Sequence, residues 1–298
     1  MEKAPETGIE ESSSPNTSQD DHKQWIEAQD DLKRRLVTED DFSWKLSKEN
    51  EEEEEEEVLL RYVGGVDISF SKEDTSVACG TLVVLDMQSQ DLQTVYHDHY
   101  LVTLTVPYVP GFLAFREAPV LLELLERMKK NAIPFYPQVL MVDGNGILHP
   151  RGFGLACHLG VLADLPTIGI GKNLHHVDGL TYSGVRQLLE NKENCTENFI
   201  TLSGCSGKIW GVAMRSTKGS LKPIFISVGH RVSLDTAITI VKMTCKYRVP
   251  EPTRQVRLLA TRSVIWPQYF ITLAQELWDM ADIRSREYLR KHQTGMSE

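Results

Sequence analysis

The order of apolar and polar residues along the chain predicts three strands followed by alternating helices and strands. The first strand is predicted at 61–70, with the sequence RYVGGVDISF, and short polar turns separate it from strands at 76–87 and 94–106. Such spacing is typical of an antiparallel meander. The near-continuous apolar run VLMV at 139–142 is typical of a strand buried on both faces of a sheet.

Helical patterns lie between and after these strands. Apolar residues at helical spacing predict helices at 20–42, 112–130, 152–165, 183–194 and 233–247. Pro119 interrupts the second of these near its start. Further strands are predicted at 166–174, 208–216 and 223–230, the last two as a possible hairpin. This order predicts an α/β fold in which helices cover both faces of a mixed sheet.

The charges divide the chain into an acidic leader and a slightly basic body. Residues 1–57 carry 20 acidic and 7 basic side chains, including seven consecutive glutamates, and the rest of the chain carries 22 acidic and 25 basic ones. We interpret the glutamate run as a solvated segment, with a cation-binding or partner-binding tail as the alternative. Five widely spaced cysteines without a CxxC pair indicate neither a disulfide framework nor a zinc site. Because no apolar run is long enough to cross a membrane, we expect an intracellular protein.

Three acidic residues lie near predicted strand ends or helix starts. Asp67 lies in the first strand, Glu117 near the start of the second helix, and Asp143 directly after VLMV. Each alone is typical of a cap, a turn or an ion pair. Neighbouring strands can also bring Asp67 and Asp143 together, and clustered carboxylates are costly unless a cation neutralises them. Such a pair suits Mg²⁺, which takes one or two protein carboxylates and fills its shell with water and phosphate oxygens.

The turn after this strand is short and rich in glycine. Gly144 and Gly146 carry no side chain, so we expect a substrate backbone to approach closely there. His149, Arg151 and Lys172 each follow a strand at the same expected edge of the sheet and could contact phosphate, although basic residues are common on any surface.

Two further features carry candidate chemistry. His230 ends a strand, where a structural role and a role as general acid or base are equally compatible with the pattern. In PYVPG, Tyr108 lies between Pro107 and Pro110, and Gly111 completes the turn. A stiff aromatic residue there could enter a base stack or fill the gap left by a displaced base, and it could equally pack beneath its own loop.

Five segments resemble one known family when they are taken in order: GGVDISF, PYVPGFLAFREAP, VDGNGILHPRGFGLACHLGV, PTIGIGKNL and ISVGHRVSL. Together they resemble endonuclease V, the inosine-directed nuclease, over residues 25–255, and so many long motifs make the signal specific. The resemblance implies a ribonuclease-H-like fold, which agrees with the strand order. It also implies a Mg²⁺-dependent endonuclease, able to use Mn²⁺, that cuts the second phosphodiester bond 3′ to hypoxanthine and leaves a 3′-hydroxyl and a 5′-phosphate.

Catalytic roles are carried over by motif. The resemblance implies that Asp67 and Asp143 bind the metal, that Glu117 is the third acid of the site, and that His230 is the catalytic histidine. Mg²⁺ at such a site polarises the phosphate and stabilises the leaving oxygen.

The resemblance also implies substrate-binding positions in three loops. They are Pro107, Tyr108, Gly111, Gly144, Asn145, Gly146, His149 and Lys172. Hypoxanthine presents an N1–H and an O6 on its pairing edge, which a pocket of backbone donors and acceptors can read once the base is turned out.

The motifs resemble those of vertebrate family members, and this resemblance implies a substrate and a cellular location for the protein. The resemblance implies that vertebrate members are ribonucleases that prefer inosine-containing single-stranded RNA, whereas bacterial members act on deoxyinosine in DNA. A contact to the ribose 2′-hydroxyl would explain a preference for RNA. The resemblance implies a monomer in the cytoplasm and the nucleus or nucleolus, with no membrane partner. One alternative is a deoxyinosine-directed DNA repair nuclease, and another is an inosine-binding splice variant that has lost catalysis.

The chain departs from the family pattern near its C-terminus. In the family EPTRQ would run directly into ADIRSREYLRK, but 25 residues, Val256–Met280, intervene here. Because all candidate catalytic residues precede this insert, we expect it to affect stability or RNA affinity rather than the catalytic fold. The predicted domain organisation is a disordered leader (1–20), an N-terminal helix with the glutamate run (21–57), a catalytic domain (58–255), the insert (256–280) and a tail (281–298).

Overall fold

The computed structural model describes residues 19–46, 58–191, 198–217, 220 and 222–260. The glutamate run, nearly all of the predicted leader, and the insert and tail beyond residue 260 lie outside the described residues, so the predictions made for them stay predictions.

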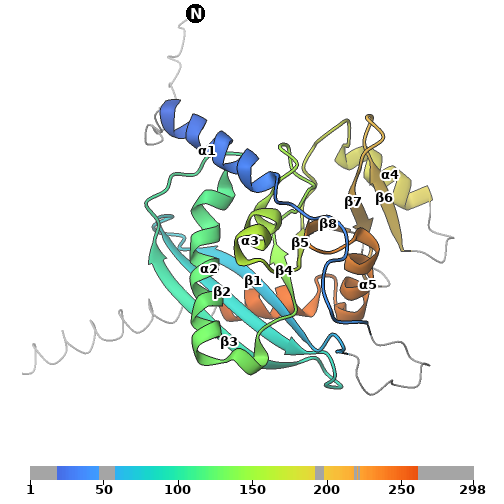
Figure 1. The fold of residues 1–298 in the computed structure, drawn as a ribbon. Helices are drawn as coiled ribbons and strands as arrows, with labels where there is room; N and C mark the ends of the chain where they lie inside the picture. The colour runs from blue at the N-terminus through green and yellow to red at the C-terminus, as the bar shows by residue number, and fades with distance from the viewer. Residues whose placement is uncertain (1–18, 47–57, 192–197, 218–219, 221, 261–298) are drawn as a thin grey trace, which may run out of the picture.

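One eight-stranded sheet forms the centre of the fold, in the order β3-β2-β1-β4-β5-β8-β7-β6 (Figure 1). The strands are β1 (Tyr62–Phe70), β2 (Val77–Asp86), β3 (Gln93–Thr103), β4 (Val139–Asp143), β5 (Thr167–Gly171), β6 (Phe199–Ser203), β7 (Ile209–Met214) and β8 (Ile224–His230). The first three are antiparallel, β4 and β5 run parallel to β1, and β8 runs antiparallel to β5. This mixed sheet confirms the predicted α/β, ribonuclease-H-like fold class.

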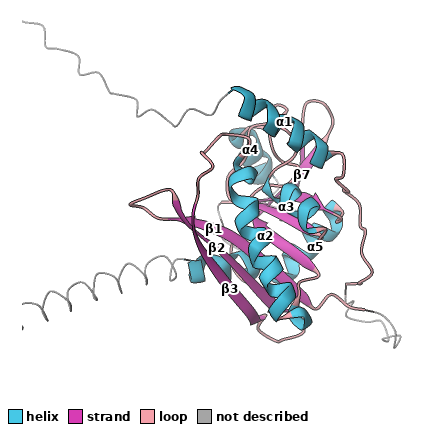
Figure 2. Cartoon of the chain, turned by 60° about the vertical axis from the view of Figure 1, so that its left-hand side comes forward, coloured by secondary structure: helices cyan, strands magenta, loops and turns pink. Residues whose placement is uncertain are grey.

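The central strand β4 has apolar side chains on both of its faces. Leu140 and Val142 pack in a cluster with α2 (Leu113–Asn131) and α3 (Leu155–Ala163), which lie side by side over the strands in Figure 2. Val139 and Met141 pack in a second cluster with α5 (Leu234–Thr244). Since successive strand residues point to opposite faces, an unbroken apolar run is the pattern that two covered faces require.

The N-terminal helix α1 (Gln19–Lys33) lies against α3 and the first turn of α2. The ring of Trp25 stacks on that of Phe115 at 5.5 Å, and it also contacts Phe112 at 6.1 Å. The chain after α1 then reaches the far end of β8, where Val37 and Arg231 pair through their backbones. Helix α1 is therefore packed on the domain through aromatic and polar contacts.

Four local features differ from the sequence prediction. Helix α1 ends at Lys33, whereas the helical pattern predicted a helix to residue 42. Helix α2 continues through Pro119, because apolar residues on both sides of the proline are buried against the sheet and hold the helix in place. Strand β6 was not predicted; it pairs with β7 and extends the predicted β7–β8 hairpin. Residues 251–260 are helical, and buried Val256 at the start of the insert packs against Val83 and Leu85.

The remaining short elements are α4 (Tyr182–Asn191) and the 3-10 turn η1 (Ile133–Phe135). None of the helices in the described part of the chain has the length and apolar character needed to span a membrane.

Candidate active site

Two aspartates from neighbouring strands meet at one end of the sheet. Val66 of β1 lies opposite Val142 of β4 in a parallel pair, so Asp67 and Asp143 come next to each other one residue further along. Their carboxyl groups are hydrogen-bonded to each other. Burial, and then the negative charge of Asp143, raise the pKa of Asp67 from 3.8 to about 8. The structure thus brings together the two predicted metal ligands.

Lys172 and Glu117 complete this cluster. The Lys172 ammonium, just beyond the end of β5, forms an ion pair with Oδ2 of Asp143. Glu117, on the first turns of α2, is buried, and burial followed by the charge of Asp143 raises its pKa to about 7 against the opposing effect of Arg116. Three carboxyl groups and one ammonium therefore share a confined, partly dehydrated space.

A divalent cation suits the pair of aspartates. Their oxygens are hard ligands, and the high pKa of Asp67 reflects first its burial and then the like charge of Asp143, which a cation would neutralise. Within the described ranges no three His, Cys, Asp or Glu side chains converge on one point as a metal site. Asp67 and Asp143 would therefore hold the ion, with water and phosphate oxygens filling its shell.

His230 lies at the opposite end of the sheet from the aspartates. On β5, Ile170 lies beside Asp143 and opposite Ile226 of β8, whereas His230 lies opposite Thr167. At about 3.3 Å per residue, the four steps from Ile226 to His230 span about 13 Å. Because β5 and β8 run antiparallel, a residue at the end of β8 cannot reach the end of β4. The structure does not bring His230 to the carboxylates.

His230 makes contacts that are typical of a structural role. Its Nδ1 atom accepts a hydrogen bond from the backbone N–H of Val37 at 3.2 Å, and its side chain is buried. It lines a surface cavity of about 260 Å³ with residues from the segment after α1, from the end of α3 and from the end of β8. This geometry favours the structural alternative and gives no support to the implied role as catalytic histidine.

The glycine-rich turn after Asp143 faces the protein rather than a substrate. The N–H of Gly146 donates to Oγ of Ser227 at 2.8 Å, and a Cβ on Gly146 would overlap the carbonyl oxygen of Val228. The N–H of Gly144 donates to the Ile170 carbonyl at 3.2 Å. A glycine is required at position 146 because β8 approaches closely there. The sequence predicted a different cause, the close approach of a substrate backbone.

Asn145 lies between these two glycines and is also buried. Its carbonyl accepts from Ala156, and the carbonyl of Gly146 accepts from Gly154. Most of the backbone groups that the resemblance assigns to a base pocket are thus engaged within the fold. Oδ1 of Asn145 has no hydrogen-bond partner among the described residues.

His149 lies further along the same loop and is uncharged. Burial, and then His175 and Arg151, lower its pKa to about 4. Its Nδ1 accepts from the N–H of Arg151 at 3.2 Å, which leaves the proton on Nε2. At neutral pH His149 can therefore donate a hydrogen bond to a phosphate but adds no positive charge.

The PYVPG loop presents its aromatic side chain to solvent. Tyr108 is 65% exposed and does not pack beneath its own loop. Gly111 has φ of +84°, which favours glycine, and the N–H of Phe112 closes the turn by donating to the carbonyl of Val109 at 3.0 Å. The following residues enter α2 and lead within two turns to Glu117. The loop is therefore held close to the acidic cluster by α2.

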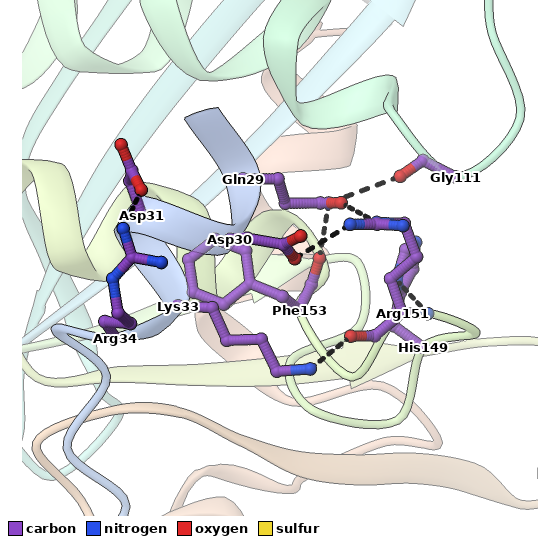
Figure 3. Close-up of polar contacts among 9 residues, drawn as sticks. All are labelled: Gln29, Asp30, Asp31, Lys33, Arg34, Gly111, His149, Arg151 and Phe153. Carbon is purple, nitrogen blue, oxygen red and sulfur yellow. Dashed lines mark hydrogen bonds and ion pairs between the residues drawn. The ribbon is translucent and has the colours of Figure 1, made fainter. Parts of the chain in front are cut away.

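Gln29 of α1 connects this loop with the loop after Asp143 (Figure 3). Its Nε2 donates to the carbonyls of Gly111 at 3.3 Å and Phe153 at 3.1 Å, and its Oε1 accepts from Nε of Arg151. The side chain is only 1% exposed. Gln29 was not predicted from the sequence as a site residue, because a polar residue in an amphipathic helix is typical of its solvated face.

Comparison with known proteins supports one family. The family model described as Endonuclease V matches residues 41–257. The human protein named endonuclease V is 44% identical over 232 residues, covering 78% of this chain and 73% of that protein. The mouse protein of the same name is also 44% identical over 232 residues, but the match spans 61% of its length.

Solved structures agree with the sequence comparison. The catalytic domain of human endonuclease V superposes with a TM-score of 0.75 at 39% identity, covering 83% of this chain and 97% of that one. Endonuclease V of Ciona intestinalis, solved with a 24mer DNA containing an inosine followed by a ribo-adenosine, gives a TM-score of 0.73 at 32% identity, covering 82% and 98%.

Proposed function

This chain belongs to the endonuclease V family, and on that premise we propose that it is a metal-dependent endonuclease acting on inosine-containing nucleic acid. The observation that carries the proposal is the contact between Asp67 and Asp143 beside the ammonium of Lys172. Two touching carboxylates at the end of adjacent strands form a poor structural pair, because each disfavours ionisation of the other. They form a good ligand pair for Mg²⁺ or Mn²⁺.

The protein side chains have separate tasks in phosphodiester hydrolysis. Asp67 and Asp143 would hold the ion, which supplies Lewis-acid polarisation of the phosphate when bound. Lys172 pairs with Asp143 and can turn from it to a phosphate oxygen of the substrate. Glu117, with a pKa of about 7, exists in both protonation states near neutral pH and can hold or release a proton beside the site.

Displacement of the base from its stack is assigned to the exposed PYVPG loop. A displaced hypoxanthine leaves a gap in the stack, and the exposed ring of Tyr108 on its stiff, proline-flanked loop is suited to fill it. Gln29 fixes the carbonyl of Gly111 at the end of this loop relative to the loop that follows Asp143. The spacing between base displacement and cleavage then depends on α1 as well as on the sheet.

We propose that the substrate is single-stranded RNA cut at the second phosphodiester bond 3′ to inosine, leaving a 3′-hydroxyl and a 5′-phosphate. The Ciona relative was solved with DNA in which a ribo-adenosine follows the inosine, and this favours recognition of a ribose next to the modified base. The same complex is largely DNA, so deoxyinosine-containing DNA is the second candidate substrate.

Cleavage of end-labelled single strands tests the proposal. The strands are matched in sequence and carry inosine or guanosine in RNA, in DNA, or in DNA with one ribonucleotide 3′ to the base. We expect cleavage of the inosine RNA with Mg²⁺ or Mn²⁺ and none with Ca²⁺ or with chelator. The mixed strand should be cut faster than all-DNA.

Asp143→Asn separates the enzyme from a binding protein that has lost catalysis. The variant should bind the inosine strand and fail to cut it, whereas the wild type does both. Equal cleavage by the variant and the wild type excludes the proposed site. Binding by the wild type without cleavage in any metal favours the inosine-binding alternative.

A further inference from the structure

Cations from two distant segments converge on the loop between Asp143 and α3. A Cβ built on Gly152 would lie 3.3 Å from Nζ of Lys33, at the end of α1, and 3.7 Å from Nζ of Lys208, just before β7. Both lysines are exposed. Two like charges facing one backbone position repel each other, which is a cost that a bound anion would remove.

Neither ammonium is neutralised by an ion pair within the described residues. Nζ of Lys33 donates to the carbonyl of Arg151 at 2.7 Å, as Figure 3 shows, and Nζ of Lys208 lies 4.1 Å from the centre of the Trp210 ring. Of the bordering carboxylates, Asp30 pairs with Arg151 at 2.8 Å. The geometry leaves two positive charges available to an anionic ligand.

The second bordering carboxylate is also engaged elsewhere. Asp178 accepts hydrogen bonds from Ser206 and from the Trp210 indole, and these hydrogen bonds lower its pKa. It therefore stays ionised and supports the indole beneath Lys208. The charge of Lys208 also lowers this pKa slightly, although the two groups form no ion pair among the described residues.

Side-chain contacts and the short chain segment 172–175 connect this cationic surface with the acidic cluster. Lys172 pairs with Asp143, and His175, three residues further along, lies with its ring 5.7 Å from that of His149. Nδ1 of His149 in turn accepts from Arg151, whose carbonyl contacts Lys33. A strand whose scissile phosphate lies at the aspartates can continue along these residues.

We propose that Lys33 and Lys208 form a docking surface for the phosphodiester backbone of the substrate strand, beyond the contacts made by Lys172 and His149. This inference rests on the proposed function, since it takes a nucleic-acid strand as the ligand. Lysines act on phosphate as point charges and carry no information about the base, so the surface contributes affinity and not inosine specificity.

The test is the salt dependence of binding. Fluorescence anisotropy measures the affinity of the full chain for single-stranded RNA with inosine or guanosine, in chelator so that no strand is cut. Removal of one lysine–phosphate interaction lowers the slope of log K against log salt by about 0.7 for single strands. We expect Lys33→Gln and Lys208→Gln each to show this decrease, and the double variant to show about twice as much.

Lys130→Gln is the matched control, because Lys130 is an exposed lysine near the far end of α2. It should leave both affinity and slope unchanged. In cleavage assays the double variant should raise KM several-fold with kcat nearly unchanged, since interactions with the strand backbone act on ground state and transition state alike. Replacement of both residues by arginine should restore the salt slope.

An unchanged salt slope in the double variant overturns the inference, and so does failure of the arginine pair to restore it. If the wild type cuts no inosine strand but the double variant still loses salt-dependent RNA binding, the docking surface stands while the proposed function fails. If the wild type cuts the inosine strand and the double variant cuts it with the same KM, the proposed function stands and the docking surface is overturned.

Discussion

Replacement of Asp67 by Asn should stabilise the metal-free protein while it abolishes cleavage. Asp67 has a pKa of about 8 in the fold against 3.8 for the free side chain, because it is buried beside Asp143. Between these two pH values the folded state retains a proton that the unfolded chain has released. The free energy of unfolding therefore falls as pH rises through this window. The contribution of Asp67 to that free energy is lowest above pH 8, where the carboxyl group is ionised in both states.

The magnitude follows from the width of that window. About four pH units at about 1.4 kcal/mol per unit set an upper limit of about 6 kcal/mol. Partial solvent access and the charge of Lys172 reduce the cost, so we expect a gain of about 1–3 kcal/mol in Asp67→Asn at pH 8 and none at pH 4. For a domain of this size this corresponds to an increase in Tm of about 3–10 °C.

Thermal unfolding in chelator at several pH values measures this effect. The difference in Tm between Asp67→Asn and wild type should grow from pH 5 to pH 8. Asp91→Asn, at a surface aspartate that is 87% exposed, should show no such growth. Added Mg²⁺ should raise the Tm of the wild type more than that of the Asn variant, because the ion binds the folded state through that carboxylate.

Equal Tm values for Asp67→Asn and the wild type at pH 8 in chelator would contradict this prediction. A difference in Tm that does not depend on pH would contradict it as well. Either result would mean that the two carboxyl groups do not share the confined space that the structure shows.

Three further predictions follow from the site. Gly146→Ala should lower the free energy of unfolding by more than about 3 kcal/mol in denaturant titration, because its Cβ would overlap a β8 carbonyl, whereas Gly144→Ala, whose Cβ would lie 3.4 Å from Leu155, should cost less than about 1 kcal/mol; equal costs would contradict this packing. His230→Ala should keep kcat within about threefold of wild type even if Tm falls, since it lies away from the aspartates; a loss of 100-fold or more with an intact fold would return it to the catalytic site. Gln29→Leu should raise KM for the inosine strand about tenfold and cost about 1–3 kcal/mol of stability, because one buried and one part-buried backbone carbonyl lose their donor; Gln29→Glu, which keeps the shape and loses the donor, should behave similarly.

Several elements could be predicted from the sequence because their signals are local. The apolar run ending at Asp143 identified a strand buried on both faces, and alternation with polar turns identified the β1–β3 meander. Pro119 was a misleading local signal, since the packing of α2 on the sheet outweighs the missing backbone hydrogen bond. Strand β6 was missed because five residues at the end of a polar segment carry too weak a pattern.

The candidate site divides in the same way. Strand order and motif identity predicted that Asp67 and Asp143 lie near each other, and the parallel register of β1 and β4 places them side by side. Lys172 follows the next strand over and reaches Asp143. His230 also follows a strand, but β8 runs antiparallel to β5, so its end lies at the opposite edge of the sheet.

The sequence by itself determined the residue types of the acidic cluster, the order of the elements and the family. Only the tertiary structure decided which strand ends share an edge, because strand direction depends on long-range pairing that no local pattern records. It also brought Gln29 and Lys33 of α1 onto loops more than 75 residues away in the sequence. Such contacts arise when an amphipathic helix packs on the finished domain, and the helix pattern does not specify the surface that it will cover.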